Sequence, residues 1–445
     1  MALKGLDIFK LTPKTNCKQC GNPTCMAFAM KVAQGAVSID KCPHMSDAAK
    51  ATLSEATAPP MKSFKFGAGE AEHALGGETV LFRHDKTFVN HSLFGVNVCT
   101  KCDFEAVAAE TEKVSYERIG EHMYTEIYNL RFVGDQDAYV ELVKKAQGRG
   151  RALILECTDA AAAAAALDVC AADKPILNGA TPDNYKEMAE LAKAKGVLLG
   201  VSAPDLDALY DTTAAIEGLG YKDLVLDVTG PTVKDTYANA IQVRRAALKD
   251  KDRTFGYPSI VNLGKIAAGD VTKQTALASM FVLKYGSIIL MDGMSYAQAL
   301  PLFGLRQNIF TDPQKPMKVE PGIYALNGAT ADSPCATTVD FALTYFIVSG
   351  ERERSGVPVN LLISDAGGYS VLTAWAAGKF SAGSIARFFK EQDIESKISS
   401  RDLIIPGKAA VLKGELEEQL PGWKIIVAPN EATGLVKFMK DLVNA

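Results

Sequence analysis

Short apolar runs recur at regular intervals along the middle of the chain and alternate with amphipathic stretches. Eight of these runs predict β-strands, at residues 87–98, 125–132, 151–157, 175–178, 197–201, 223–227, 258–263 and 287–291. The stretches between them, such as DQDAYVELVKKAQ and DNYKEMAELAKAKG, carry apolar residues at helical spacing. Because eight successive strand–helix units favour a closed barrel over an open sheet, we expect a central (β/α)8 TIM barrel over residues 59–325.

The last third of the chain, residues 326–445, shows the same alternation on a smaller scale. FALTYFIVSG, VNLLISDA and WKIIVAP predict strands, whereas SVLTAWAAGKF, SAGSIARFFKEQ and ATGLVKFMKDLV predict helices. We expect a flavodoxin-like or Rossmann-like α/β sheet, which binds flat cofactors at the carboxyl ends of its strands. Three loops are candidates for such a site: DAGGYSVLT, IPGKAA and APNEATG. Turn and capping chemistry favours the same residues, so the three together carry more weight than any one alone.

The first tenth of the chain holds four of the nine cysteines, Cys17, Cys20, Cys25 and Cys42, spaced C-x2-C-x4-C-x16-C. The two-residue gap lets neighbouring thiolates bind one metal or one cluster face, and the glycine and proline that follow turn the chain back. The run MAFAMKVA predicts a helix that begins near Cys25, where the helix dipole stabilises a thiolate. We predict a small amino-terminal [4Fe–4S] domain over residues 1–58, with structural zinc as the alternative.

Other polar and sulfur-containing residues give weaker signals. Cys99 and Cys102 form a second CxxC without a further pair nearby, and we interpret them as thiols at a strand end. Polar residues stand at the ends of several predicted strands, where a barrel places its chemistry: Thr158, Asp159, Asn178, Asp227 and Thr229. Capping of the helices that follow would explain most of them.

Composition and charge indicate which partners and which cellular compartment to expect. A hydrophobic content of 48% and a charged content of 22% are ordinary for a soluble protein, and a net charge of −4 disfavours a nucleic-acid-binding surface. No apolar run is long enough to span a membrane, and the start MALKGLDIFKL lacks a signal-peptide pattern. We therefore expect a cytoplasmic protein, whose cysteines are thiols or metal ligands rather than a disulfide scaffold.

The cysteine motif, followed by a barrel and a sheet, resembles the large (gamma) subunit of the corrinoid iron–sulfur protein of the reductive acetyl-CoA pathway. The likeness extends through FRHDKTF, FGYPSI, LRQNIFTDPQ, LTYF and IIPGKAAVLKG, and the cysteine motif is its most specific part. The resemblance implies a [4Fe–4S] cluster bound by the four amino-terminal cysteines and a base-off corrinoid of the cobalamin type. The corrinoid contacts that it implies are Thr338, Thr344, Phe346, Gly368, Ser370, Val371, Leu372, Thr373, Pro406, Gly407, Pro429, Glu431 and Ala432.

By this resemblance the chain is a methyl-group carrier without a catalytic residue of its own. The corrinoid Co(I) accepts a methyl group from methyltetrahydrofolate through a separate methyltransferase and delivers it to acetyl-CoA synthase, while the cluster reductively reactivates Co(II). The implied partners are a small subunit in a heterodimer, the methyltransferase, acetyl-CoA synthase and a low-potential electron donor. We expect a hinge at residues 318–330, KVEPGIYALNGAT. Two alternatives stay open: a barrel that itself binds a methylpterin, and a ferredoxin-like electron-transfer protein.

The positions of the histidines bear on the corrinoid chemistry. All five of them lie within the first 122 residues, so the proposed corrinoid domain contains none. Many corrinoid methyltransferases use a D-x-H-x-x-G loop whose histidine binds cobalt from below, and this sequence lacks such a loop. A cobalt without a strong lower ligand favours Co(I) and is easier to reduce, which agrees with a nearby cluster as reductant.

Overall fold

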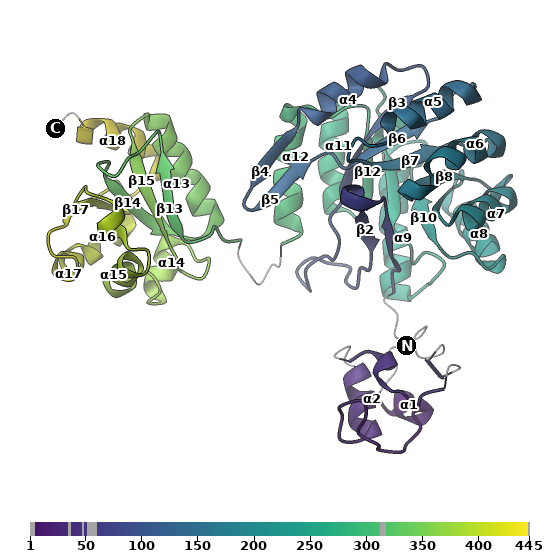
Figure 1. Ribbon diagram of the computed structural model, residues 1–445, viewed down its shortest axis with the longest axis horizontal. Helices are drawn as coiled ribbons and strands as arrows, with labels where there is room; N and C mark the ends of the chain where they lie inside the picture. Colours follow the sequence, from purple (N-terminus) through teal and green to yellow (C-terminus); the bar gives the residue numbers. More distant parts are fainter. Residues whose placement is uncertain (1–4, 34–36, 47–48, 51–59, 312–316, 444–445) are drawn as a thin grey trace. The chain divides into compact units, whose positions relative to one another are not determined.

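The computed structural model describes residues 5–33, 37–46, 49–50, 60–311 and 317–443 (Figure 1). Contacts divide the chain into two compact units, one of residues 1–116 and 123–310 and one of residues 117–122 and 311–445. The expected start of the last domain, residue 326, therefore falls inside the second unit. The expected boundary at residues 58 and 59 lies outside the described residues.

The amino-terminal segment is helical. It contains α1 (Gly5–Leu11), α2 (Cys25–Ala33) and the short 3-10 helix η1 (Ile39–Lys41). Its apolar core includes Ile8, Phe28 and Val32, together with the sulfur-bearing side chains of Cys42 and Met45. A core this small gives little stability by itself, and domains of this size usually need a metal or disulfides.

Eight parallel strands close into a barrel and confirm the predicted (β/α)8 architecture. The strands are β3 (Leu93–Cys99), β6 (Ile127–Arg131), β7 (Ala152–Glu156), β8 (Ile176–Ala180), β9 (Leu198–Ser202), β10 (Leu224–Asp227), β11 (Ser259–Asn262) and β12 (Ile288–Met291). They follow one another around the barrel in chain order, and β12 closes it by pairing with β3. The first strand begins at Leu93, six residues later than expected, and the other seven lie within about two residues of their predicted positions.

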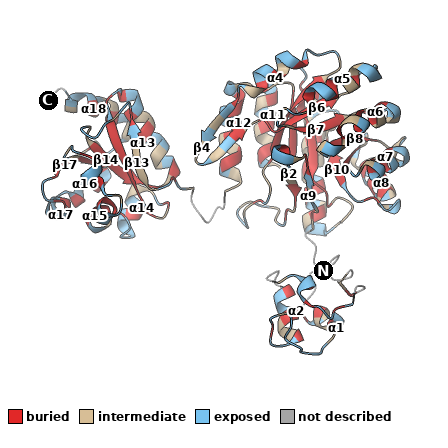
Figure 2. Cartoon of the chain, viewed as in Figure 1, coloured by how far each residue is buried: buried red, intermediate tan, exposed pale blue. Residues whose placement is uncertain are grey.

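Helices follow the barrel strands where amphipathic stretches predicted them. The helices are α4 (Phe104–Glu112), α5 (Gln136–Ala146), α6 (Ala160–Cys170), α7 (Tyr185–Lys195), α8 (Leu206–Gly218), α9 (Val233–Arg245), α10 (Leu263–Ile266), α11 (Val271–Leu283) and α12 (Tyr296–Ile309). Figure 2 shows the strands buried and the outer helix faces exposed. Within the described residues, no helix is both long and apolar enough to cross a membrane.

Two antiparallel hairpins form separate two-stranded sheets. The first hairpin consists of β1 (Ser63–Phe66) and β2 (His73–Gly76), which pair antiparallel; its turn and second strand lie in the glycine-rich stretch GAGEAEHALGG. Phe66 and Leu75 pack against the first residues of the barrel strands, including Leu93 and Ile127, so this hairpin covers the amino end of the barrel. The second hairpin, β4 (Ser115–Arg118) and β5 (Glu121–Tyr124), was not predicted.

The carboxy-terminal unit contains a five-stranded sheet in the order β13-β15-β14-β16-β17. Its strands are β13 (Gly322–Leu326), β14 (Cys335–Val339), β15 (Val359–Ser364), β16 (Asp402–Ile405) and β17 (Lys424–Val427); β13 is antiparallel to β15 and the other pairs are parallel. Its main helices are α13 (Ala342–Ser355), α14 (Val371–Ala376), α15 (Ala382–Glu391), α17 (Lys413–Gln419) and α18 (Leu435–Val443). The predicted strands VNLLISDA and WKIIVAP and the three predicted helices are confirmed.

Side chains of successive strand residues point to opposite faces of this sheet. Leu361 and Ile363 pack with Leu435 and Met439 of α18 on one face, whereas Leu362 packs with α15 on the other. Helix α13 lies on the α18 side, where the two helices contact each other. The sheet is therefore the middle of three layers.

Two expectations for this unit are wrong. FALTYFIVSG forms the first part of α13 and not a strand, because its buried residues Ala342 and Ser349 continue at helical spacing into Arg352 and Ser355. The strand of this region is the preceding CATTV, β14, all five residues of which are buried. Residues 318–330, expected to be a hinge, contain β13, which is hydrogen-bonded to β15 along its whole length.

Candidate functional site

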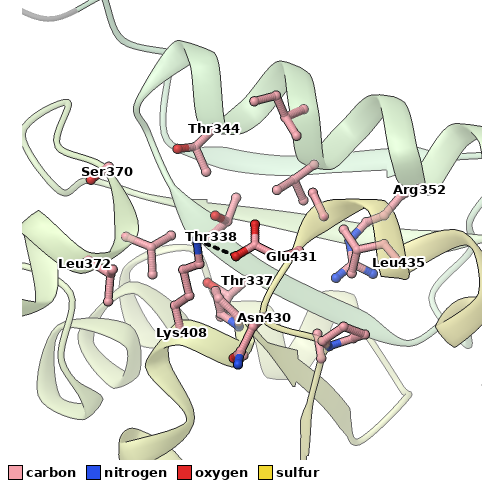
Figure 3. A pocket seen from close by; sticks show the side chains of 18 residues that line it. Thr337, Thr338, Thr344, Arg352, Ser370, Leu372, Lys408, Asn430, Glu431 and Leu435 are labelled. Carbon is pink, nitrogen blue, oxygen red and sulfur yellow. Dashed lines mark ion pairs between the residues drawn. The ribbon is translucent and has the colours of Figure 1, made fainter.

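A pocket of about 280 Å³ opens at the carboxyl ends of the parallel strands of the carboxy-terminal sheet. Of the parallel strands, β14 comes first in the chain; β15 then pairs with one side of it and β16 with the other side. The point where the strand order reverses in this way is where open α/β sheets bind ligands. Thr337 and Thr338 of β14 line the pocket, together with residues of the loops that follow β15, β16 and β17 (Figure 3).

Ten of the thirteen residues expected to contact a corrinoid line this one pocket. They are Thr338, Thr344, Ser370, Val371, Leu372, Pro406, Gly407, Pro429, Glu431 and Ala432. Phe346 lies on α13, does not line the pocket and has 37% of its surface exposed. Gly368 and Thr373 belong to the loop and helix start after β15 without lining the cavity; the Thr373 Oγ1 lies 3.0 Å from the Ser370 Oγ.

Eight residues of the pocket wall were not among the expected corrinoid contacts. Three of them lie in the candidate loops IPGKAA and APNEATG, namely Lys408, Ala428 and Asn430, and the sequence analysis missed the other five: Thr337, Ile347, Val348, Arg352 and Leu435. The most informative of them lie on α13, where Thr344, Val348 and Arg352 follow one another at intervals of four residues. Residues at this spacing share one helix face. The periodicity was present in the sequence, but the interpretation of FALTYFIVSG as a strand concealed it.

The loop after β15 is held in place by a buried carboxylate at the end of β14. The Asp340 Oδ1 accepts hydrogen bonds from the Ala366 N–H at 3.0 Å and the Gly368 N–H at 2.9 Å. The Lys318 ammonium group lies 3.5 Å from the other oxygen of Asp340 and 3.4 Å from Asp365. A hydrogen bond from the Gly367 N–H at 3.0 Å is the main reason that the pKa of Asp365 is lowered.

The loops after β16 and β17 touch each other through Gly407. A Cβ atom at this position would lie 2.4 Å from the carbonyl oxygen of Ala428 and 2.7 Å from the backbone nitrogen of Asn430. Only a residue without a side chain allows this approach. Near the contact, the Lys408 ammonium group and the Glu431 carboxylate form an ion pair at 3.1 Å (Figure 3).

One wall residue, Thr338, has a buried hydroxyl group that a ligand could satisfy. Thr338 is 1% exposed, and its Oγ1 has no hydrogen-bond partner among the described residues. A buried hydroxyl without a partner costs roughly 1–3 kcal/mol. Ile347, Val348 and Leu435 add apolar surface beside it. An apolar cavity with a few unsatisfied polar groups is the usual form of a cofactor site, so these residues fit a bound corrinoid.

Helix α2 begins at Cys25, as predicted. The Cys25 N–H donates to the Asn16 Oδ1 at 2.7 Å, and the Asn16 N–H donates to the Cys25 Sγ at 3.4 Å. The Asn22 side chain donates to the Cys20 Sγ at 3.7 Å. Lys14, Asn16, Lys18 and Gly21 adopt positive φ angles, and loops of this kind direct backbone N–H groups toward an anion or an iron–sulfur cluster.

The four cysteines differ in how far they are buried. Cys25 and Cys42 are buried, Cys20 is half-buried and Cys17 is exposed. In the part of the chain that the structure describes, no group of three or more His, Cys, Asp and Glu side chains could hold one metal ion. A cubane cluster spaces its ligand sulfur atoms farther apart than one ion does, and N–H groups that point at sulfur stabilise its negative charge.

The interpretation of Cys99 and Cys102 as free thiols is wrong, because the structure joins them in a disulfide. They lie at the end of β3, where a turn brings their Cα atoms to 5.2 Å. This separation is within the ordinary range for a disulfide.

Polar residues at the carboxyl end of the barrel bind one another. The Glu156 carboxylate accepts a hydrogen bond from Asn129 at 2.6 Å, and the Asp227 carboxylate accepts one from Asn178 at 3.2 Å. Lys265 lies 3.2 Å from both carboxylates. The negative charge of Asp227, followed by that of Glu156, raises the pKa of Lys265 above its ordinary value of 10.5.

The other predicted strand-end residues have structural contacts. Asp159 caps α6 by accepting a hydrogen bond from the Ala162 N–H at 3.0 Å, as capping chemistry predicted. The Thr229 hydroxyl accepts one from the Asn262 N–H at 2.8 Å, and the Thr158 carbonyl accepts one from Asn184. Each of the three residues therefore has a hydrogen bond within the barrel, and none of these bonds involves a ligand.

Comparisons with known proteins bear on both sites. Residues 63–439 match the family described as "CO dehydrogenase/acetyl-CoA synthase delta subunit", and residues 13–44 match the family described as "Putative Fe-S cluster". Among solved structures, the 3-dehydroquinate dehydratase from Aquifex aeolicus VF5 covers 49% of this chain and 99% of its own, at 10% identity and a TM-score of 0.33, too low for an argument.

Several curated relatives match almost the whole chain. The corrinoid/iron-sulfur protein large subunit of Moorella thermoacetica is 38% identical over 99% of both chains. The acetyl-CoA decarbonylase/synthase complex gamma subunit of Archaeoglobus fulgidus is 35% identical over 96% of both, and that of Methanothermobacter thermautotrophicus is 31% identical over 100% of both. The chain therefore belongs to the CO dehydrogenase/acetyl-CoA synthase delta-subunit family, together with these large and gamma subunits.

Proposed function

We propose that this chain is a methyl-group carrier subunit that binds a corrinoid in the carboxy-terminal pocket and a [4Fe–4S] cluster at Cys17, Cys20, Cys25 and Cys42. The observation that carries the proposal is the convergence of three loops, those after β15, β16 and β17, on one pocket where the strand order reverses. Without the antiparallel strand β13, the four parallel strands numbered in chain order lie as 2-1-3-4 across the sheet. The flavodoxin-like sheet has the order 2-1-3-4-5, so we assign that fold to this domain. The names of the full-length relatives support both cofactors.

The pocket residues would hold the corrinoid through hydroxyl and backbone groups. A bound corrinoid supplies a cobalt nucleophile that accepts and donates methyl groups. Thr338 offers a buried hydroxyl without a partner, and the paired hydroxyls of Ser370 and Thr373 stand at the start of α14. Because residues 326–445 contain no histidine, this domain offers no imidazole ligand for the lower face of cobalt. The protein thus positions the cofactor without binding the metal strongly.

The cysteine site would hold a cluster that supplies electrons at low potential. The dipole of α2 and the N–H group of Asn16 both stabilise negative charge at Cys25. We propose that the cluster restores the reduced cofactor after accidental oxidation and takes no part in ordinary turnover. It would receive its electrons from a separate low-potential donor.

Exposed apolar side chains on α13 and α14, two helices that contribute residues to the pocket wall, support docking of other proteins. Leu343, Phe346 and Ile347 of α13 and Leu372 and Trp375 of α14 are each between 37% and 58% exposed. Large apolar side chains gathered beside a ligand site usually mark an interaction surface. We propose that the small subunit, the methyltransferase and acetyl-CoA synthase meet the protein here. The barrel then serves as a scaffold, since its strand-end polar groups are occupied by one another.

The absorption spectrum and metal content of protein purified without oxygen test this proposal. We expect corrinoid bands, cluster absorption, and about one cobalt and four iron atoms per chain. Cluster absorption without a corrinoid would contradict the carrier function and favour an electron-transfer protein. Binding of methyltetrahydrofolate by the isolated chain in the absence of corrinoid would instead favour a barrel enzyme.

A further inference from the structure

Arg352 is a buried cation in the wall of the corrinoid pocket. It lies on α13 one turn after Val348 and is 3% exposed. Its Nη1 donates to the Met439 Sδ at 3.0 Å, and its Nε has no partner among the described residues. Burial lowers the pKa of Arg352 to about 10, which leaves the guanidinium group charged at neutral pH. Thioether sulfur is a weak acceptor and cannot neutralise that charge.

The other buried arginines of the described chain are neutralised. Arg244 lies 3.1 Å from the Glu78 carboxylate, and Arg306 lies 2.5 Å from the Glu126 carboxylate. Both pairs are almost fully buried. Buried charges are normally paired in this way, because an isolated one costs several kcal/mol. Arg352 therefore stands out as the member of this set whose counter-charge is missing from the described residues.

The acidic residue in the same pocket does not supply that counter-charge. Glu431 forms its ion pair with Lys408, and its side chain is 73% exposed. Burial alone accounts for the lowered pKa of Arg352, without a contribution from any carboxylate. In Figure 3 the Arg352 side chain comes from α13 and ends beside Leu435. The wall thus presents one unpaired guanidinium group among apolar side chains.

We infer that Arg352 binds the phosphodiester of the nucleotide arm of a corrinoid, so that this site selects corrinoids that carry the nucleotide. The inference deepens the proposed function and rests on it. The other peripheral arms of a complete cobalamin end in neutral amides, which leaves the phosphodiester as its anionic arm. Guanidinium groups bind phosphate oxygens through two parallel hydrogen bonds. The cavity of about 280 Å³ has room for one arm of the corrinoid, while the macrocycle would lie at its opening.

Equilibrium dialysis of the full-length apoprotein against cobalamin and against cobinamide, which lacks the nucleotide and its phosphate, tests the inference. We expect the unchanged protein to bind cobalamin about 10- to 100-fold more tightly than cobinamide. Arg352→Met should remove most of this preference by weakening cobalamin binding, with cobinamide binding changed by less than about twofold. Arg354→Met is the matched control, since Arg354 lies on the same helix with a 72% exposed side chain, and it should change neither.

The stability of the apoprotein gives a second readout. Replacing an unpaired buried charge by an apolar side chain of similar length should leave the Tm of Arg352→Met equal to or above that of the unchanged protein. Equal affinities of the unchanged protein for cobalamin and cobinamide would overturn the inference and leave the methyl-carrier function standing. Equal weakening of both ligands by Arg352→Met, or a lowered Tm, would also overturn it, since a structural role predicts those results. Absence of any corrinoid binding would overturn the proposed function itself.

Discussion

Gly407→Ala probes the contact between the two loops that form one wall of the pocket. Its Cβ would lie 2.4 Å from the Ala428 oxygen, 2.6 Å from the Pro429 carbonyl carbon and 2.7 Å from the Asn430 nitrogen. All three are backbone atoms, so no side chain can rotate away and the loops must separate. Such overpacking costs about 1–3 kcal/mol of unfolding free energy. Because the loops hold the ligand between them, we also expect corrinoid affinity to fall about tenfold.

Tryptophan fluorescence during urea unfolding measures this effect in the right part of the chain. Both tryptophans, Trp375 and Trp423, lie in the carboxy-terminal unit, so their signal reports on this unit and not on the barrel. Gly414→Ala is the matched control: its Cβ would meet nothing within 4 Å, and alanine favours the helix α17 in which it lies. If Gly407→Ala matched Gly414→Ala in both unfolding free energy and corrinoid affinity, the loop contact would not shape the pocket.

Three further predictions follow from the other sites. Cys20→Ala should lower the iron content while leaving cobalt bound, and should block reactivation by an electron donor but not methyl transfer from chemically reduced protein. The electron paramagnetic resonance spectrum of the Co(II) state should lack nitrogen splitting, and Thr373→His should introduce it; splitting in the unchanged protein would refute the reasoning. Lys265→Met should lower the free energy of unfolding by about 1–3 kcal/mol, because Glu156 and Asp227 lose their shared cation. Solvent screens the exposed part of Lys265 and keeps this loss small. Because folding raises the pKa of Lys265, this loss should stay constant from about pH 7 to 9 and shrink only above the ordinary lysine value of 10.5.

The sequence predicts the barrel well because its local signals agree with its tertiary packing. Each barrel strand is a short apolar run, and several of the helices that follow begin at a capping residue such as Asp159 or Asp205. Burial on both faces makes parallel strands continuously apolar, and this pattern is easy to recognise. The β4–β5 hairpin escaped prediction because SYER and EHMY have no such apolar pattern.

Prediction failed where a buried strand is not apolar. CATTV of β14 is fully buried, yet two of its five residues are threonines, so the apolar helix start FALTYFIVSG beside it was taken for the strand. This error displaced Thr344 to a strand and left Arg352 unnoticed. The loop residues of the pocket were predictable from turn chemistry, whereas Arg352 depends on the helix period and on the absence of a nearby carboxylate among the described residues, which only packing reveals.

The antiparallel pairing of β13 has a mechanical consequence. Gly322 pairs with Ile363 near the carboxyl end of β15, so the chain joins this domain at the edge that carries the pocket. Just before β13, the Val319 N–H donates to the backbone carbonyl oxygen of Asp340 at 2.8 Å. The neighbouring Lys318 forms ion pairs with the carboxylates of Asp340 and Asp365. A pull on the chain at this attachment point would act directly on the residues that hold the glycine loop. The same residues therefore fix both the entering chain and the glycine loop of the pocket. A force on the chain at this point would change the position of that loop and, through it, the affinity for the ligand.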